Sequence, residues 1–165
     1  MTVSEDFGFK FKLYIILHHA MTAMWPVSEY KGEGKTLRRW NMAVSASDIN
    51  GLKTKLVDAR TALVTMLGES DKQKQEGCRT TVKNLTNETI SLFSILMVNA
   101  KGTNVEGKLK ELKDAWDIFR NTRDNEVIPN YFAGKVAEAK AVGGGIQKER
   151  FAKISSMVDE LIGMT

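Results

Sequence analysis

The stretch TISLFSILMVNA, residues 89–100, decides how the rest of the chain must be arranged, because it carries no charge in a protein of which 27% of the residues are charged. At α-helical spacing its large apolar side chains share one broad face and continue around both sides. They are Ile90, Leu92, Phe93, Ile95, Leu96, Met97 and Val98. This pattern predicts a central helix, residues 80–100, that several neighbouring helices bury.

A second apolar segment begins at Phe7 and ends at Trp25, just before Pro26. Its aromatic and aliphatic residues fall on several sides of a helix, so this helix also needs cover. One enclosed helix is easy to cover in a chain of 165 residues, and two are not. We therefore expect residues 7–25 to contact a second copy of the chain or a protein partner.

The remaining sequence predicts further helices over residues 35–46, 47–67, 104–122, 131–142 and 146–162. Apolar residues at three- and four-residue spacing predict one core-facing side for each of three helices. In 47–67, the most regular of them, which ends at Gly68, these residues are Ile49, Leu52, Leu56, Ala59, Leu63 and Met66. In 104–122 they are Val105, Leu109, Leu112, Trp116 and Phe119, and in 146–162 they are Phe151, Ile154, Val158 and Leu161. Residues 69–79 read as a loop or a frayed helix start, and residues 124–130, with Pro129, read as a turn. Gly143, Gly144 and Gly145 read as a turn that folds the last helix back, giving a C-terminal helical hairpin, residues 131–163. The expected fold class is all-α: one domain, residues 1–165, built as a bundle of five or six helices around the central one.

The composition bounds the class of protein. A single cysteine, Cys78, excludes an intrachain disulfide and any multi-cysteine metal site. The first residues are acidic, unlike the start of a secretory signal, which favours an intracellular, cytoplasmic location. No apolar run reaches the roughly 20 residues of a membrane-spanning helix, so we expect no membrane partner. We also predict no metal and no cofactor.

Charge is the best functional signal. The net charge is +4, and the segment that starts at Lys31 and ends at Arg60, with seven basic and three acidic residues, accounts for all of it. Basic side chains on one helix face can contact nucleic-acid phosphates without reading sequence. A solvated helix face is the alternative interpretation. The predicted nucleic-acid-binding residues are Lys35, Arg38, Arg39, Lys53, Lys55 and Arg60.

Three other features suggest weaker hypotheses. The glycine run precedes a helix start with Lys148 and Arg150, which could contact a phosphate. His18 and His19 are neighbours that point about 100° apart on a helix, so we interpret them as packing residues rather than metal ligands. Cys78 has Arg79 beside it but no other part of a cysteine-enzyme arrangement, so we interpret it as incidental.

Three functions remain open. The favoured one is a non-catalytic structural subunit of a larger, self-associating assembly that contacts an RNA or DNA backbone through its basic face. The second is an intracellular adaptor or effector that binds proteins and has no nucleic-acid role. The third is a helical enzyme with a site assembled from distant residues, which we disfavour because no catalytic motif is present.

Overall fold

The computed structural model of the protein describes residues 43–165, which lie within one compact unit, Trp40–Thr165. In this part of the chain every regular element is a helix, which confirms the all-α class. The helices are α2 (Ala46–Gly68), α3 (Lys72–Ala100), α4 (Glu106–Thr122), the π-helical turn η1 (Arg123–Val127), α5 (Ile128–Phe132), α6 (Val136–Gly144) and α7 (Ile146–Met164). The predicted helix at residues 7–25 and the pair His18 and His19 lie outside the described residues.

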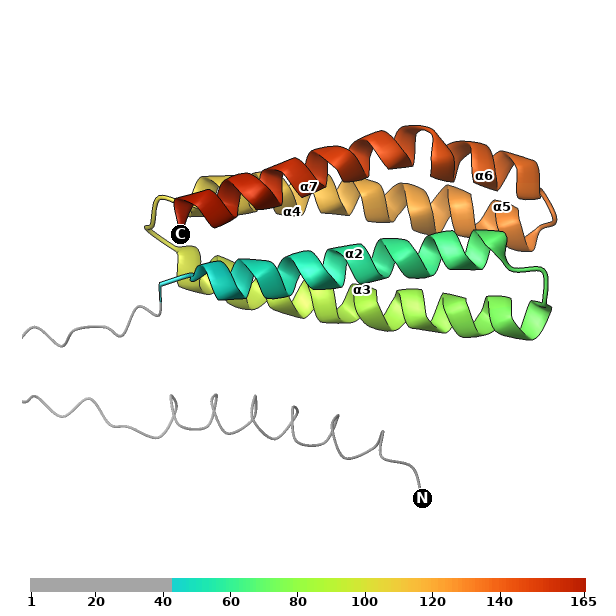
Figure 1. The fold of residues 1–165 in the computed structure, drawn as a ribbon, viewed down its shortest axis with the longest axis horizontal. Coiled ribbons are helices and arrows are strands. Elements are labelled where there is room, and N and C mark those ends of the chain that lie inside the picture. The colour runs from blue at the N-terminus through green and yellow to red at the C-terminus, as the bar shows by residue number, and fades with distance from the viewer. Residues whose placement is uncertain (1–42) are drawn as a thin grey trace, which may run out of the picture. The chain divides into compact units, whose positions relative to one another are not determined.

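These elements form four antiparallel rods in the described part of the chain, rather than the five or six helices expected (Figure 1). Helices α2 and α3 are one rod each; α4, η1 and α5 follow one another without a break; α6 and α7 meet at Gly145. The chain reverses at residues 133–135, where Gly134 has a φ of +83°, a conformation that suits glycine. The turn predicted at Gly143 to Gly145 is therefore wrong, because Gly143 and Gly144 belong to α6.

The core lies between the rods and is built from one apolar stripe of each. All six residues predicted to face the core from residues 47–67, now part of α2, are buried: Ile49, Leu52, Leu56, Ala59, Leu63 and Met66. The predicted inner faces of α4 and α7 are buried as well, with Trp116 on the former and Phe151 on the latter. These stripes were correctly predicted because their spacing keeps apolar side chains on one side of a straight helix.

Helix α3 differs from its prediction in two ways. It begins at Lys72, not near residue 80, because the Asp71 side chain accepts a hydrogen bond from Lys74 N–H at 2.9 Å and caps the first turn. It is also not enclosed: Ile95 is 48% exposed and Val98 is 75% exposed. The charge-free stretch therefore contributes one wall of the core and leaves its outer side uncovered in the described structure.

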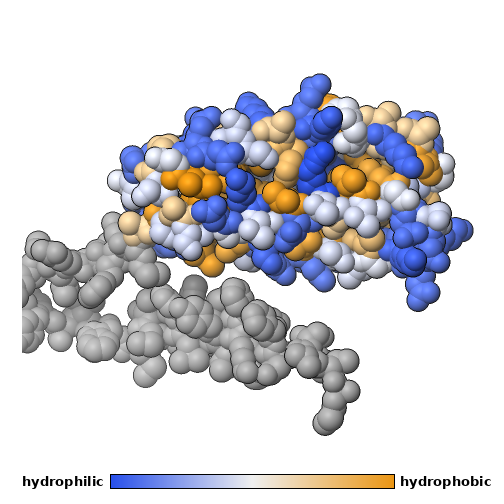
Figure 2. Space-filling view, viewed as in Figure 1, coloured by the Kyte–Doolittle hydropathy of each residue, from blue (hydrophilic) through white to orange (hydrophobic). Residues whose placement is uncertain are grey.

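The surface of the described rods is mixed. Figure 2 shows apolar residues on the drawn face as separate patches between hydrophilic ones. Residues 43–45, predicted as the end of a helix, are not helical; Ser45 instead caps α2 through reciprocal hydrogen bonds with Asp48. Between residues 43 and 165 there is no helix with the length and apolar character needed to cross a bilayer.

Candidate anion-binding groove

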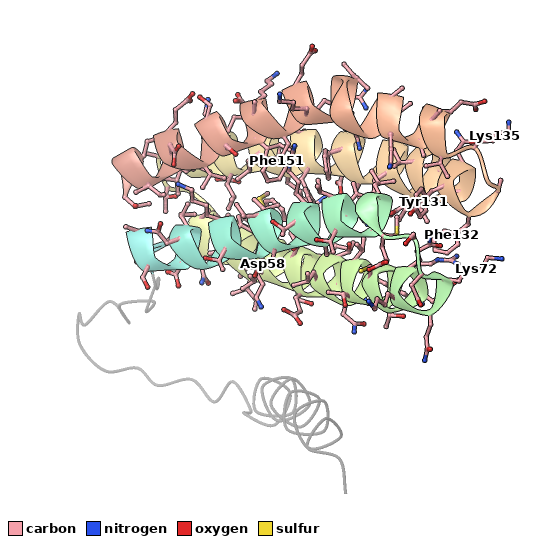
Figure 3. The ribbon with its side chains drawn as sticks, turned by 45° about the vertical axis from the view of Figure 1, so that its right-hand side comes forward. Asp58, Lys72, Tyr131, Phe132, Lys135 and Phe151 are labelled. Carbon is pink, nitrogen blue, oxygen red and sulfur yellow. The ribbon has the colours of Figure 1, made fainter. Side chains whose placement is uncertain are left out.

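The basic residues of α2 that were predicted to bind nucleic acid contact other helices of the protein. Lys53 Nζ lies 2.7 Å from Asp159 of α7, and Lys55 Nζ lies 2.7 Å from Glu88 of α3. The hydrogen bond with Glu88 raises the pKa of Lys55 above its ordinary value. The Arg60 guanidinium stacks 5.0 Å from the ring centre of Phe151, which is labelled in Figure 3. These three cations thus reach towards two different helices instead of forming one open face, and their role in binding nucleic acid remains a prediction.

The other predicted binding residues divide between the two parts of the chain. Lys35, Arg38 and Arg39 lie outside the described residues. Arg150 Nη1 donates to Thr122 Oγ1 at 2.6 Å and to Gln147 Oε1 at 3.2 Å, so it ties α7 to α4. Lys148 is exposed in the first turn of α7. Their contact with a phosphate also remains a prediction.

The structure gives the glycine run a packing role. A Cβ at Gly143 would lie 2.9 Å from the side chain of Leu67, so the absence of a side chain lets α6 approach α2 closely. Cys78 is half-buried and lines a shallow groove beside Asp58 and Thr65. Across residues 43–165 no three His, Cys, Asp or Glu side chains gather in a group that could hold a metal ion.

A groove of about 350 Å³ runs between α3 and the rod formed by α4 and η1. Its apolar floor includes Val82 and Ile128, which are 2% and 8% exposed. Its polar walls carry four cations and one carboxylate. The cations are Arg79, Lys83, Arg120 and Arg123, and the carboxylate is Asp124. Such a wall is suited to a negatively charged group.

The π-helical turn follows Arg123 and keeps the buried stripe on one side of the rod. The buried residues Phe119, Arg123, Val127 and Tyr131 follow one another at four-residue steps. In an α-helix of 3.6 residues per turn, repeated four-residue steps would carry side chains steadily around the axis. The wider π turn, marked by the hydrogen bond from Ile128 N–H to Arg123 C=O, brings Val127 and Tyr131 back to the inner face. Arg123 itself stands one ordinary four-residue step after Phe119, in register with the core, and is only 1% exposed.

Arg123 is partly satisfied by its neighbours. Its Nε donates to Asp124 Oδ1 at 2.7 Å, and its Nη2 donates to Thr86 Oγ1 at 2.8 Å and to Asp124 Oδ2 at 3.2 Å. Thr86, itself buried, comes from α3, so the pair joins the two walls of the groove. The guanidinium carbon lies 5.7 Å from the ring centre of Trp116, a cation–π contact beneath the groove.

Within the described residues, three buried side-chain nitrogens have no hydrogen-bond partner: Trp116 Nε1, Arg120 Nε and Arg123 Nη1. All three are donors, and all belong to the rod that contains α4 and η1. Buried donors without partners are costly and uncommon in folded proteins. Two of the three belong to residues that line the groove.

The cations of the groove differ in how far they are neutralised. Arg79 lies 3.6 Å from Glu76, Arg120 lies 3.3 Å from Asp117, and Arg123 pairs with Asp124. Arg79 also stacks 4.9 Å from the ring centre of Phe132, which Figure 3 places near the end of the bundle where α3 begins. No ion pair within residues 43–165 involves Lys83, which is exposed. The groove therefore has about one positive charge in excess.

Sequence reasoning did not find this groove, because its cations come from segments about forty residues apart that only the pairing of α3 with α4 brings together. One signal was present: Arg123 stands four residues after Phe119, in register with the core. Comparison with protein-family models, with curated proteins and with solved structures finds no match to this chain.

Proposed function

We propose that the protein is a non-catalytic helical subunit that contacts the phosphate backbone of RNA or DNA. The observation that carries this proposal is the groove between α3 and α4, where four cations surround an apolar floor and face one carboxylate. Lysine and arginine are the side chains that contact nucleic-acid phosphates most often, and such contacts carry little sequence preference.

The predicted basic residues before the described part belong to the same proposal. Lys35, Arg38 and Arg39 would add positive charge. Lys53, Lys55 and Arg60 would contribute only if they left their present partners, so we expect them to matter less. Self-association through residues 7–25 would place several copies along one strand and raise the apparent affinity.

The test is the binding of labelled single-stranded RNA, single-stranded DNA and duplex DNA at increasing salt. The wild-type chain should bind at low salt and release as salt rises. Alanine at both Arg79 and Lys83 should weaken binding and reduce the salt dependence, because both side chains are exposed in the groove wall. Alanine at both Lys110 and Lys140, two exposed lysines that do not line the groove, is the charge-matched control. Absence of binding at low salt would overturn the proposal.

A second set of variants locates the contact. Alanine at Lys35, Arg38 and Arg39 should also weaken binding, whereas alanine at Lys53 and Lys55 should have the smaller effect. If the Lys53 and Lys55 double variant loses as much nucleic-acid binding, the nucleic acid contacts α2, which would contradict the assignment to the groove.

A protein-binding adaptor with no nucleic-acid role is the second candidate function. It is supported by the exposed apolar side chains Ile95 and Val98 on the outer side of α3. A pull-down at high salt separates the two proposals, whereas the mass of the purified chain does not, because the first proposal includes self-association. Recovery of one protein partner by the wild-type chain, without nucleic acid and lost in the Val98→Lys variant, would favour the adaptor.

A further inference from the structure

We propose that the groove between α3 and α4 binds a single phosphate group, held by the inner guanidinium of Arg123 with Arg120 and Lys83 around it. This inference deepens the proposed function and rests on it for the biological source of the phosphate. The binding chemistry itself depends only on the side chains of the groove.

The unpartnered side-chain atoms near the groove are all hydrogen-bond donors. Two residues that line it, Arg120 and Arg123, each have a buried nitrogen without a partner, and no buried side-chain acceptor in residues 43–165 lacks one. A water molecule would bring donors of its own together with its acceptors. A phosphodiester brings only acceptor oxygens, so it suits a wall whose unpartnered atoms are donors.

Arg123 keeps an unpartnered donor in spite of its contacts. Its bonds to Thr86 and Asp124 account for Nε and Nη2, whereas Nη1 has no hydrogen-bond partner on a side chain that is 1% exposed. Burial strengthens a charge-assisted hydrogen bond because less water competes for the donor. Arg120, three residues earlier, lines the same groove, and its Nε is also buried without a partner.

The charge of the groove limits the ligand to one phosphate. Asp117, Asp124 and Glu76 each lie beside one of the arginines, whereas Lys83 has no carboxylate beside it in the described structure. One added anionic group would balance the excess charge of Lys83. Several phosphates close together would not be balanced, so a polyphosphate chain fits the groove less well.

The experiment is calorimetric titration of the full-length chain with inorganic phosphate, in chloride buffer at constant ionic strength. We expect saturable binding of one phosphate per chain. The Lys83→Ala variant should bind phosphate about tenfold more weakly, because it loses one charge-assisted contact. The Lys110→Ala control should bind as the wild type does.

Arg123→Lys tests the inner site, because lysine keeps the charge but has no guanidinium fork. We expect it to lose saturable phosphate binding while circular dichroism still reports the folded helices. Should that variant unfold, the exposed Lys83→Ala variant decides the question. Heat signals that chloride reproduces, or that neither variant changes, would overturn the phosphate site.

The two proposals fail in different ways. Saturable phosphate binding by a chain that binds no nucleic acid would retain the phosphate site and reject the nucleic-acid function. Nucleic-acid binding that depends on Arg79 and Lys83, with no binding of inorganic phosphate, would retain the function and reject the single-phosphate site.

Discussion

The charge-free end of α3 and the charged helix α4 contribute to the same core in similar ways. Residues 89–100 contain no charge, while eight of the 17 residues of α4 are charged. Both nevertheless bury one narrow stripe: Phe93 and Leu96 from α3, and Trp116 and Phe119 from α4, are all at most 3% exposed. The charge-free stretch is no better covered than its charged neighbour.

The difference lies in how the outer side of each helix meets water. Helix α4 covers it with charged side chains, such as Lys113, which lies 2.7 Å from Asp117. Helix α3 uses hydroxyl groups bonded to its own backbone: Ser91 Oγ donates to Asn87 C=O and Ser94 Oγ donates to Ile90 C=O, each at 3.0 Å. A helix segment without charged residues can therefore still have one side that is exposed to solvent.

The largest expected effect tests the buried stripe of α4. Trp116 is fully buried and stacks on Phe119 with ring centres 5.3 Å apart. Trp116→Ala should lower the free energy of unfolding by about 3–5 kcal/mol, because it removes a large side chain and leaves a cavity. Ile118→Ala, at a position that is 54% exposed on the same helix, should change it by less than about 0.5 kcal/mol. Denaturant unfolding measures both, and similar losses in the two variants would contradict the assigned inner face.

The next prediction tests whether one side of residues 89–100 is exposed to solvent. Leu96→Ala should cost about 2–5 kcal/mol, since Leu96 is buried. Val98→Ala, two residues away on the exposed side, should stay within about 0.5 kcal/mol in the same unfolding experiment. A loss above about 1 kcal/mol at Val98 would show that another surface covers this side in solution and would end the contrast with α4.

The fold could be predicted from sequence where apolar spacing follows a straight helix. The stripes of α2, of α4 as far as Phe119, and of α7 were correct because three- and four-residue steps average one helical turn. The prediction failed on α3, because it took the absence of charge for burial on all sides. It also took residues 124–130, with Pro129, for a turn, although the rod of α4, η1 and α5 continues through them, with Pro129 just after the π-helical turn, where the regular α-helical bonding is already interrupted.

The groove could not be predicted because it depends on two polar residues at core positions, one on each side of the groove, that contact each other only in the folded chain. Thr86 interrupts the apolar stripe of α3, and Arg123 interrupts that of the rod containing α4 and η1. Each is a polar residue at a core position, and each is explained by the other, since they are hydrogen-bonded at 2.8 Å. Sequence alone shows the two interruptions but neither their pairing nor the π turn that follows Arg123.

The smallest expected effect concerns the first turn of α2, where a charged side chain contributes to stability. Asp48 accepts hydrogen bonds from Ser45 Oγ at 2.7 Å and Ser45 N–H at 2.9 Å, and these bonds hold its pKa below the ordinary value. A lowered folded-state pKa stabilises the protein above the unfolded-state pKa of about 3.9, and this stabilisation is lost as the pH falls through the lower folded value.

Asp48→Ala should therefore cost about 0.5–1 kcal/mol at pH 7, near the low end for a cap because the carboxylate is exposed. The difference from the wild type should shrink below about pH 4, where the carboxyl of the wild type becomes protonated. Ser47→Ala, an exposed neighbour in the same turn, is the control. Thermal unfolding from pH 7 down to pH 3 measures the difference. A loss that is constant across this range would mean that packing, rather than the charge of Asp48, stabilises the start of α2.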